Sequence, residues 1–290
     1  MNPIVLLRKL FLGGTWYVGL RDVSLTDGRN YKQVETPKGQ WIADPFLYEE
    51  NGHHYLFVEQ YFKDKQRAGI GVYDIVDGKA INNRVIIDNP YHMSYPCVFN
   101  YNGNRYMIPE SSANNTVDIY MAEEFPDNWI HVKSLIKGEK YVDSTVYIFE
   151  DEYYLLSYKK VDNGWDLVVF LIDMENLELT KKAVEHFSTN IGRPGGFLFQ
   201  ENGKLLRPAQ DCSKKYGESL IIYNVQGIKN ADIQETAQGV ISHRDVVFPV
   251  SIDRVHTLNT DSRYEVVDVF KEKIDLLHGI RIFKRAYLKH

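Results

Sequence analysis

The chain has 290 residues, of which 44% are hydrophobic and 25% are charged, and this globular composition excludes global disorder. The formal net charge of −5 excludes a general attraction to nucleic acid, so we expect no nucleic-acid partner. Two cysteines, Cys97 and Cys212, are too few for a disulfide framework and lack the spacing of metal ligands. We therefore expect reduced thiols and a cytoplasmic protein.

The N-terminal segment 4–12 is apolar except for Arg8 and Lys9. It is too short to span a bilayer, and no small-residue cleavage site follows it, so we predict neither a transmembrane helix nor a signal peptide. The favoured interpretation is a strand or helix that packs on the domain. The alternative is a short amphipathic helix in peripheral contact with a membrane.

One hairpin pattern recurs along the chain. Residues 41–59 read WIADPFLYEENGHHYLFVE, and residues 95–110 read YPCVFNYNGNRYMIPE. This self-similarity indicates a repeat architecture. At one offset of 51 residues, the aligned positions are Asp44 with Tyr95, Pro45 with Pro96, Asn51-Gly52 with Asn102-Gly103, Tyr55 with Tyr106, and Glu59 with Glu110.

Three further copies follow. One starts at Asp143, at an offset of 99 from Asp44, and another carries Asn202-Gly203 at an offset of 151 from Asn51-Gly52. An alternating apolar strand, an Asn-Gly turn and a second strand are together a strong hairpin signal. The last copy is weaker and lacks Asn-Gly. The predicted hairpins are 44–59, 95–110, 143–158, 193–210 and 255–270.

Strand-like segments also lie between the hairpins, so each unit holds about four strands in about 50 residues, the scale of a propeller blade. Five such units fit once an N-terminal stretch of about 40 residues is set aside. We therefore predict an all-β fold, a five-bladed β-propeller that forms a single domain over 1–290. A β-sandwich is the alternative, but it leaves the constant offsets unexplained. We also predict a short C-terminal helix over 271–288.

Repeat geometry brings acidic residues together, because the first strand of every blade lines the central channel. Asp44 and Asp143 begin innermost strands, while Glu59, Glu110 and Gln210 end the following strands at the same rim. Carboxylates that share a well raise each other's pKa, which leaves one protonated and another ionised near neutral pH. This division suits the making or breaking of a glycosidic bond.

Other residues near this rim are candidates for substrate binding. Arg193 and Arg207 could bind an anionic group in a bidentate manner, with pairing to the rim acids as the alternative. Asp44, Glu59 and His256 offer ligands that would suit calcium, but they show no compact ligand spacing. Since the chain also lacks a Gly-rich phosphate loop, we predict no metal and no cofactor. The remaining candidates for substrate contact are Trp41, Glu59, His92, Tyr95, Gln210, Asp211, His256 and Asn259.

WIADPF followed by a hairpin resembles the five-bladed propellers of glycoside hydrolase families 43, 32 and 130. A closer resemblance extends from about residue 40 to residue 270 and is to the N-terminal propeller domain of plant glucosamine inositolphosphorylceramide transferases and its stand-alone bacterial relatives. The segments that carry it are WIADPFLY, HMSYPCVF, YMIPESS, FPDNWI, RPGGFLF, LLRPAQDCSKKYGESL and VHTLN.

The resemblance to the hydrolases implies that Asp44 is a general base and that Asp143 orients the substrate and tunes pKa values. The hydrolase acid lies on a later blade, where this chain has Arg193, Arg207 and Gln210 instead, so Glu110 becomes the candidate acid.

The function that the resemblance implies is that of a glycosyltransferase or hydrolase in surface-polysaccharide or glycolipid biosynthesis. Its substrate would be a sugar, a nucleotide-sugar or a glycolipid. The alternative is a non-catalytic glycan-binding propeller that serves a partner glycosyltransferase.

Overall fold

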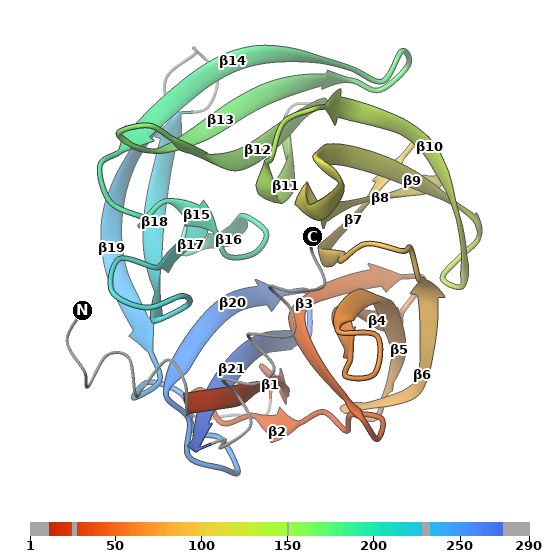
Figure 1. Ribbon diagram of the computed structural model, residues 1–290, viewed down its shortest axis with the longest axis vertical. Coiled ribbons are helices and arrows are strands. Elements are labelled where there is room, and N and C mark those ends of the chain that lie inside the picture. The colour runs from red at the N-terminus through yellow and green to blue at the C-terminus, as the bar shows by residue number, and fades with distance from the viewer. Residues whose placement is uncertain (1–11, 25–27, 150, 228–232, 275–290) are drawn as a thin grey trace.

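The computed structural model describes residues 12–24, 28–149, 151–227 and 233–274. Within these ranges the chain is built from β-strands and one short 3-10 turn, η1 (Ser112–Asn114). The strands form five sheets that stand around a common centre like blades (Figure 1). The predicted all-β, five-bladed propeller is confirmed.

Each blade is an antiparallel sheet whose innermost strand faces the centre. Blade 1 contains β3 (Gln40–Glu50), β4 (His53–Phe62), β5 (Arg67–Val76) and β6 (Lys79–Ile87). Blade 2 contains β7 (Ser94–Tyr101), β8 (Asn104–Ser111), β9 (Thr116–Glu124) and β10 (Asn128–Lys137). Blade 3 contains β11 (Val142–Phe149), β12 (Glu152–Val161), β13 (Gly164–Asp173) and β14 (Glu178–Phe187).

Blade 4 contains β15 (Arg193–Pro194), β16 (Phe199–Glu201), β17 (Lys204–Asp211), β18 (Ser219–Gly227) and β19 (Gln234–Ser242). Its innermost strand is split into β15 and β16 at Gly195-Gly196. A Cβ on Gly196 would lie 1.9 Å from the Leu258 carbonyl oxygen, so the chain passes too close to blade 5 for a side chain. This close approach explains the second glycine of RPGGF, and a Cβ on the first, Gly195, would lie 2.7 Å from the Leu220 side chain.

The Asn-Gly turns have the geometry that their sequence predicts. Asn51 and Gly52 both have positive φ, at 50° and 76°, as a type I′ hairpin turn requires. The turns at Asn102-Gly103 and Asn202-Gly203 repeat these angles within a few degrees. Such turns fix the register of the flanking strands, so equivalent residues of different blades reach the same height in the ring.

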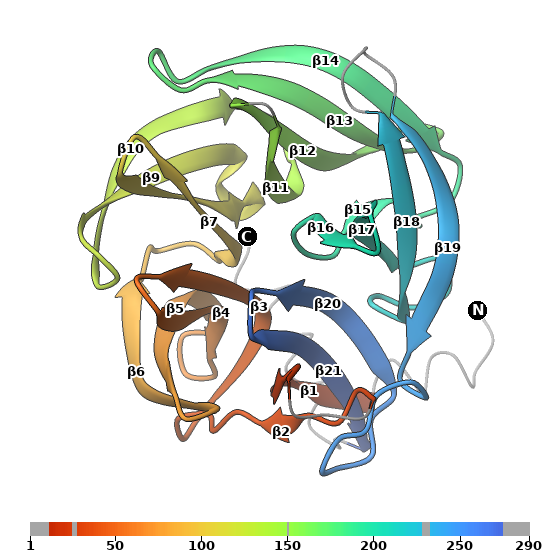
Figure 2. The same cartoon turned by 180° about the vertical axis from the view of Figure 1, so that it is seen from behind.

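Blade 5 joins the two ends of the described chain (Figure 2). It contains β20 (Arg254–Thr260), β21 (Tyr264–Ile274), β1 (Leu12–Asp22) and β2 (Lys32–Gln33), and β1 pairs with β21 along its whole length. The N-terminal stretch that the repeat count set aside therefore completes this blade. Only Leu12 of the apolar segment 4–12, for which we favoured a packed strand or helix, lies within the described residues, and it is the first residue of β1.

The predicted C-terminal helix is wrong for residues 271–274, because these residues extend β21 and pair with β1. The rest of that prediction lies outside the described residues, as does most of the apolar N-terminal segment proposed to contact a membrane. In the described part of the chain, no helix has the length and apolarity needed to cross a bilayer.

Apolar side chains pack between neighbouring blades and leave the polar residues at the centre. One cluster joins blades 1, 2 and 3 around Phe46, Tyr95 and Leu155, and three smaller clusters fill the remaining interfaces between blades. Both cysteines are free, as expected, and Cys97 is buried in the first of these clusters.

Candidate functional site

The innermost strands of the first three blades carry the same irregularity. The residues Asp44, Tyr95 and Asp143 have positive φ values of 46°, 49° and 48°, and each lies at a break in the register between its strand and the next. A β-bulge re-aims a side chain, and left-handed backbone at a residue other than glycine costs energy that is often found at functional sites. The acid-proline pair at Asp44-Pro45 therefore forms a β-bulge that orients the Asp44 side chain.

A cavity of about 210 Å³ opens where the innermost strands converge. Six residues that the sequence nominated line it: Trp41, Glu59, His92, Glu110, Arg193 and His256. Trp16, Ala43, Ser94 and Tyr216 complete its wall. We call this space the axial cavity; residues from blades 1, 2, 4 and 5 meet in it, as the repeat geometry predicts.

One group of charges lies between blades 2, 3 and 4. The Arg193 guanidinium donates to both carboxylate oxygens of Asp143, and its Nη2 also lies 3.3 Å from Glu110 Oε2. Gln210 Nε2 donates to Asp143 Oδ2 at 2.5 Å and to the Pro194 carbonyl at 2.7 Å. Arg193 thus has the arrangement that we gave as the alternative to anion binding, because it pairs with acids of the rim.

These contacts give the two carboxyl groups different protonation states. Burial and the nearby charge of Asp143 raise the pKa of Glu110 to about 8, while Arg193 opposes the rise. Burial also acts to raise the pKa of Asp143, but the Arg193 guanidinium outweighs it and holds that pKa below its usual range. At neutral pH Glu110 is therefore mainly protonated, and Asp143 is ionised.

A second group of charges lies where blades 1 and 5 meet. The buried carboxylate of Asp268 accepts from His256 Nδ1 at 2.9 Å and from the backbone N–H groups of Asp44 and Thr257 at 2.9 and 2.7 Å. His256 Nε2 lies 2.8 Å from the Tyr216 hydroxyl. Asp268 therefore fixes both the imidazole ring and the bulge that presents Asp44.

Asp44 is left comparatively free within this group. Its Oδ1 lies 3.2 Å from His256 Nδ1, yet only the contact of that nitrogen with Asp268 has hydrogen-bond geometry. Among the described residues, Oδ1 of Asp44 has no hydrogen-bond partner. Burial raises the pKa of Asp44 to about 7, against the opposing charge of His256. Asp44 is thus a buried carboxyl that can exchange a proton near neutral pH.

We expect Asp44→Asn to stabilise the protein increasingly as the pH rises. The pKa of Asp44 is raised from 3.8 to about 7, so the folded chain holds a proton that the unfolded chain releases, and stability falls across this interval. The variant lacks this loss, so its melting temperature should gain on that of the wild type between pH 4 and 7 and then level off. Thermal unfolding at several pH values measures the difference. Exposed Asp162→Asn is the control, and a gain that does not depend on pH would contradict the assignment.

The wall of the axial cavity also holds an acid and a histidine of defined orientation. The Ala68 amide donates to His92 Nδ1 at 3.1 Å, which places the ring proton on Nε2, 3.1 Å from Glu59 Oε1. Trp41 stacks on Tyr61 with ring centroids 4.5 Å apart, so its ring is held in place at the cavity wall. These residues offer a sugar both polar and flat apolar contacts.

Arg207 lies outside the axial cavity, which corrects its assignment to anion binding. Its side chain is fully buried, and Nε and Nη2 donate to the two carboxylate oxygens of Glu235 at 2.8 and 2.5 Å. Nη1 donates to the Gly192 carbonyl at 3.1 Å. A guanidinium committed to these partners holds blade 4 together.

Three other nominated residues make structural contacts. The Tyr95 hydroxyl accepts from the Gly196 amide at 2.7 Å, and Asn259 donates to the Pro45 carbonyl at 2.7 Å. Asp211 accepts from the amide and hydroxyl of Ser213 in the turn after β17. None of the three lines the axial cavity. Tyr95 and Asn259 instead bind neighbouring blades to one another.

Sequence reasoning missed Trp16, Ala43, Ser94 and Tyr216 of the cavity wall, and Asp268 behind it. Trp16 comes from the N-terminal strand that the repeat count set aside, and Tyr216 lies in the loop between β17 and β18. Asp268 did leave a signal, because an acid within the apolar run VVDVF is expensive to bury unless it is bonded.

Asp268, rather than the Glu59 that the sequence suggested, groups with Asp44 and His256. One ligand atom from each of the three lies within 4.8 Å of the others, so the group could hold a cation. Its separations of 2.9 and 3.2 Å about His256 Nδ1 are those of hydrogen bonds and close ion pairs. The same description applies to Glu49, His54 and Asp261, where His54 Nδ1 lies 2.7 Å from Asp261 Oδ2.

The fold is similar to that of solved glycoside hydrolases. A thermostable family-43 glycoside hydrolase matches with a TM-score of 0.60 and 14% identity over 82% of this chain and 91% of that one. RS223-β-xylosidase gives a TM-score of 0.58 and 14% identity over 81% and 92%. A family 117 glycoside hydrolase of Zobellia galactanivorans gives 0.54 and 12% over 92% of both chains. At such identities the likeness establishes the fold alone.

Sequence comparison gives a closer relationship. The protein "Glucosamine inositolphosphorylceramide transferase 1" of Arabidopsis thaliana is 30% identical over 205 residues, which are 67% of this chain and 27% of that protein. The protein of the same name from Oryza sativa subsp. indica is 29% identical over the same shares. This chain thus spans about a quarter of the length of these relatives. The model of the N-terminal region of this transferase matches residues 29–247. The chain therefore belongs to the family of the glucosamine inositolphosphorylceramide transferase 1 N-terminal domain.

Proposed function

We propose that this propeller is a carbohydrate-active enzyme that makes or cleaves a glycosidic bond in the axial cavity. The observation that carries the proposal is a pair of carboxyl groups, Glu110 and Asp44, whose pKa values are both raised toward neutral pH. Glu110 lines the cavity with a pKa of about 8. Asp44 does not itself line the cavity; its Oδ1 lies 3.2 Å from Nδ1 of the lining residue His256, and its pKa is raised to about 7. General acid–base catalysis is most efficient when the pKa values lie near the working pH.

The proposed roles follow from the contacts. Glu110, protonated, donates to the oxygen of the bond that breaks, and Asp44, ionised, accepts a proton from the attacking water or hydroxyl group. Asp143 stays ionised beside Arg193, and its charge keeps the pKa of Glu110 high. Atoms and charge balance, because one proton leaves Glu110 and one arrives at Asp44.

The comparisons support a function that involves carbohydrates. The identity of the substrate is proposed. The relatives are transferases whose printed name contains glucosamine and inositolphosphorylceramide, so we propose a sugar, nucleotide-sugar or glycolipid as substrate, within surface-polysaccharide or glycolipid biosynthesis. We extend the proposal to cytoplasmic action with peripheral membrane contact through the N-terminal segment. The alternative is a glycan-binding propeller that serves a partner glycosyltransferase.

Mass-spectrometric product detection tests the proposal. Purified wild type and Asp44→Asn are incubated with a panel of nucleotide-sugars, lipid-linked sugars and oligosaccharides. We expect turnover by the wild type that the isosteric variant loses, because asparagine cannot accept the proton. The exposed control Asp162→Asn should keep full turnover. Glycan binding without turnover by any of the proteins would favour the accessory function, and turnover that Asp44→Asn retains would contradict the proposed base.

A further inference from the structure

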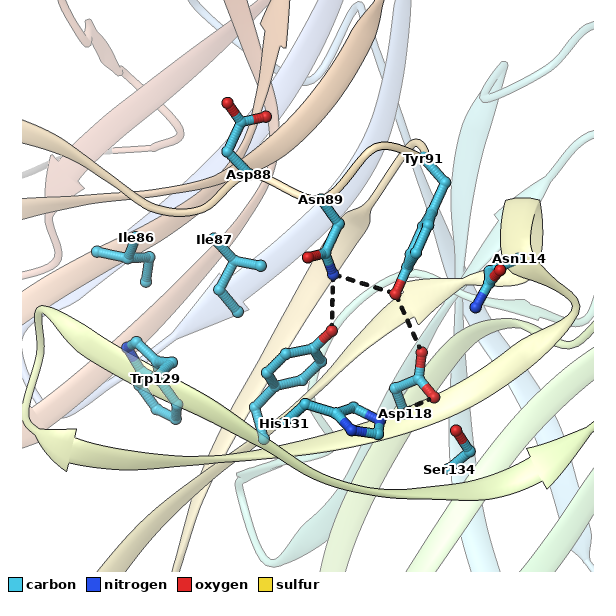
Figure 3. Close-up of a pocket in the computed structure, with 11 residues that line it drawn as sticks. Ile86, Ile87, Asp88, Asn89, Tyr91, Asn114, Asp118, Trp129, His131 and Ser134 are labelled. Carbon is cyan, nitrogen blue, oxygen red and sulfur yellow. Dashed lines mark hydrogen bonds and ion pairs between the residues drawn. The ribbon is translucent and has the colours of Figure 1, made fainter.

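A second cavity, of about 490 Å³, lies between blades 1 and 2 (Figure 3). We call it the inter-blade cavity. It shares no lining residue with the axial cavity. Its walls come from the end of β6, the loop that leads to β7, η1, and the outer strands β9 and β10. The volume falls in the range of sites that bind small molecules.

The floor of the inter-blade cavity is the carboxylate of Asp118, whose residue is 1% exposed. It accepts one bond of ordinary length, from Thr116 Oγ1 at 2.7 Å. Tyr91 Oη and His131 Nε2 approach it only to 3.5 and 3.4 Å, at the outer limit of hydrogen bonding. A carboxylate has about four acceptor sites, and burying it with few bonds is costly. The floor is therefore suited to receive donors from a ligand.

The tyrosines of the wall are oriented as donors. Asn89 Nδ2 lies 3.1 Å from Tyr91 Oη and 2.8 Å from Tyr120 Oη, so the amide donates to both hydroxyl groups. The Tyr91 hydroxyl then directs its own proton to Asp118 Oδ2 at 3.5 Å, and the Tyr120 hydroxyl keeps its proton for a further acceptor. Figure 3 shows Asn89, Tyr91 and Asp118 directed toward one another, with His131 on the opposite side of the carboxylate.

Charge selects the class of ligand. The second carboxylate of the wall, Asp88, is paired with Lys65 and Arg67. Among the lining residues no lysine or arginine faces Asp118, and its one basic neighbour there is His131, whose Nε2 lies 3.4 Å from Oδ1. A negative floor disfavours a phosphate or a carboxylate. The side chains of Ile86, Ile87 and Trp129 add an apolar wall.

We propose that the inter-blade cavity is a second carbohydrate site, which binds one neutral sugar ring through hydroxyl groups that donate to Asp118. The choice of a sugar as ligand rests on the proposed function. The inter-blade cavity is separate from the axial cavity, where the reaction is proposed. It is suited to hold another ring of the same glycan or a separate acceptor. Both cases require a ligand with several hydroxyl donors and one apolar face.

Tryptophan indole NMR signals can read the two cavities separately. Trp16 and Trp41 line the axial cavity, Trp129 lines the inter-blade cavity, and Trp165 stacks on Tyr158 away from both. The probes are the methyl glycosides of glucose, galactose and mannose, together with methyl glucuronide. We expect saturable shifts of Trp129 by at least one neutral glycoside at millimolar concentrations, as is usual for a single ring, and about tenfold weaker binding of the glucuronide.

Variants assign the response to the inter-blade cavity. Asp118→Asn should abolish the Trp129 shift. Asp166→Asn is the matched control, because Asp166 pairs with His186 on the equivalent strands of blade 3. Asp166 does not line the inter-blade cavity, so this variant should keep the shift. Asp44→Asn should alter only the responses of Trp16 and Trp41. The spectra themselves show whether each variant is folded.

Three results would overturn the second site: no Trp129 shift by any glycoside up to about 50 mM, an unchanged response in Asp118→Asn, or equal binding of the glucuronide. A Trp129 response in a protein that turns nothing over would support the second site while the proposed reaction fails. Turnover without a Trp129 response would support the reaction and overturn the second site. The two proposals can therefore fail independently.

Discussion

Replacing Glu110 with glutamine is expected to lower kcat by about 10²–10⁴-fold, the usual contribution of a general acid. The pKa of Glu110 is raised to about 8 by burial and by Asp143, so the wild-type protein carries this proton at neutral pH and loses it as the pH rises through 8. Glutamine keeps the shape and accepts hydrogen bonds but has no proton to transfer.

The pH profile separates loss of the acid from structural damage. In the wild type, kcat/KM should rise as Asp44 ionises near pH 7 and fall as Glu110 ionises near pH 8, which gives a narrow optimum between them. In Glu110→Gln the remaining activity should keep the acidic limb and lose the alkaline one. The exposed control Glu178→Gln should leave both limbs unchanged. An alkaline limb that persists in Glu110→Gln would assign it to another group.

The convergence of Asp44, Glu110 and Asp143 could be predicted because it depends only on the repeat. In a closed ring of equivalent blades, equal offsets along the chain place residues at equal heights around one axis. The Asn-Gly turns allowed the hairpins to be aligned in the sequence, since each turn fixes the register of its two strands. The raised pKa values were predictable in direction, but burial is their largest cause at Glu110 and Asp44, and repulsion between acids only adds to it.

The closure of the ring could not be predicted in the same way. β1 and β21 lie near opposite ends of the sequence and pair with each other. No local sequence pattern in either strand identifies the other as its partner. Trp16 reaches the axial cavity only through this pairing. A residue set aside as part of an unassigned N-terminal stretch thus became part of the site.

The assignment of Arg207 to the site was wrong because the repeat alone was used and the alternation of side chains along the strand was not. It lies three residues before Gln210 on β17, and the pairing of β17 with β18 runs between them without a bulge. Side chains alternate between the two faces of a strand, so residues three apart point to opposite faces. Gln210 reaches Asp143 in the core of the ring, and Arg207 cannot point the same way. Applying strand alternation to each nominated pair would have removed Arg207 from the site.

Arg207→Ala is expected to destabilise the protein by about 3–5 kcal/mol, because removal of one partner leaves the other charge of a buried ion pair uncompensated. The side chains of Arg207 and Glu235 are each 1% exposed and share two hydrogen bonds, so Glu235 would be left without its cation in the interior. The loss of the bond to the Gly192 carbonyl adds to the cost. Denaturant unfolding measures the change as a shift of the midpoint.

The same measurement on two further variants identifies the cause. Lys204→Ala removes an exposed cation from the same strand, β17, and should change stability by no more than about 0.5 kcal/mol. Arg207→Met combined with Glu235→Leu removes both charges and should recover a large part of the loss, since well-packed apolar groups avoid the desolvation of an unpaired charge. If the double variant were as unstable as Arg207→Ala, the loss would come from packing in blade 4, and the ion pair would not be its source.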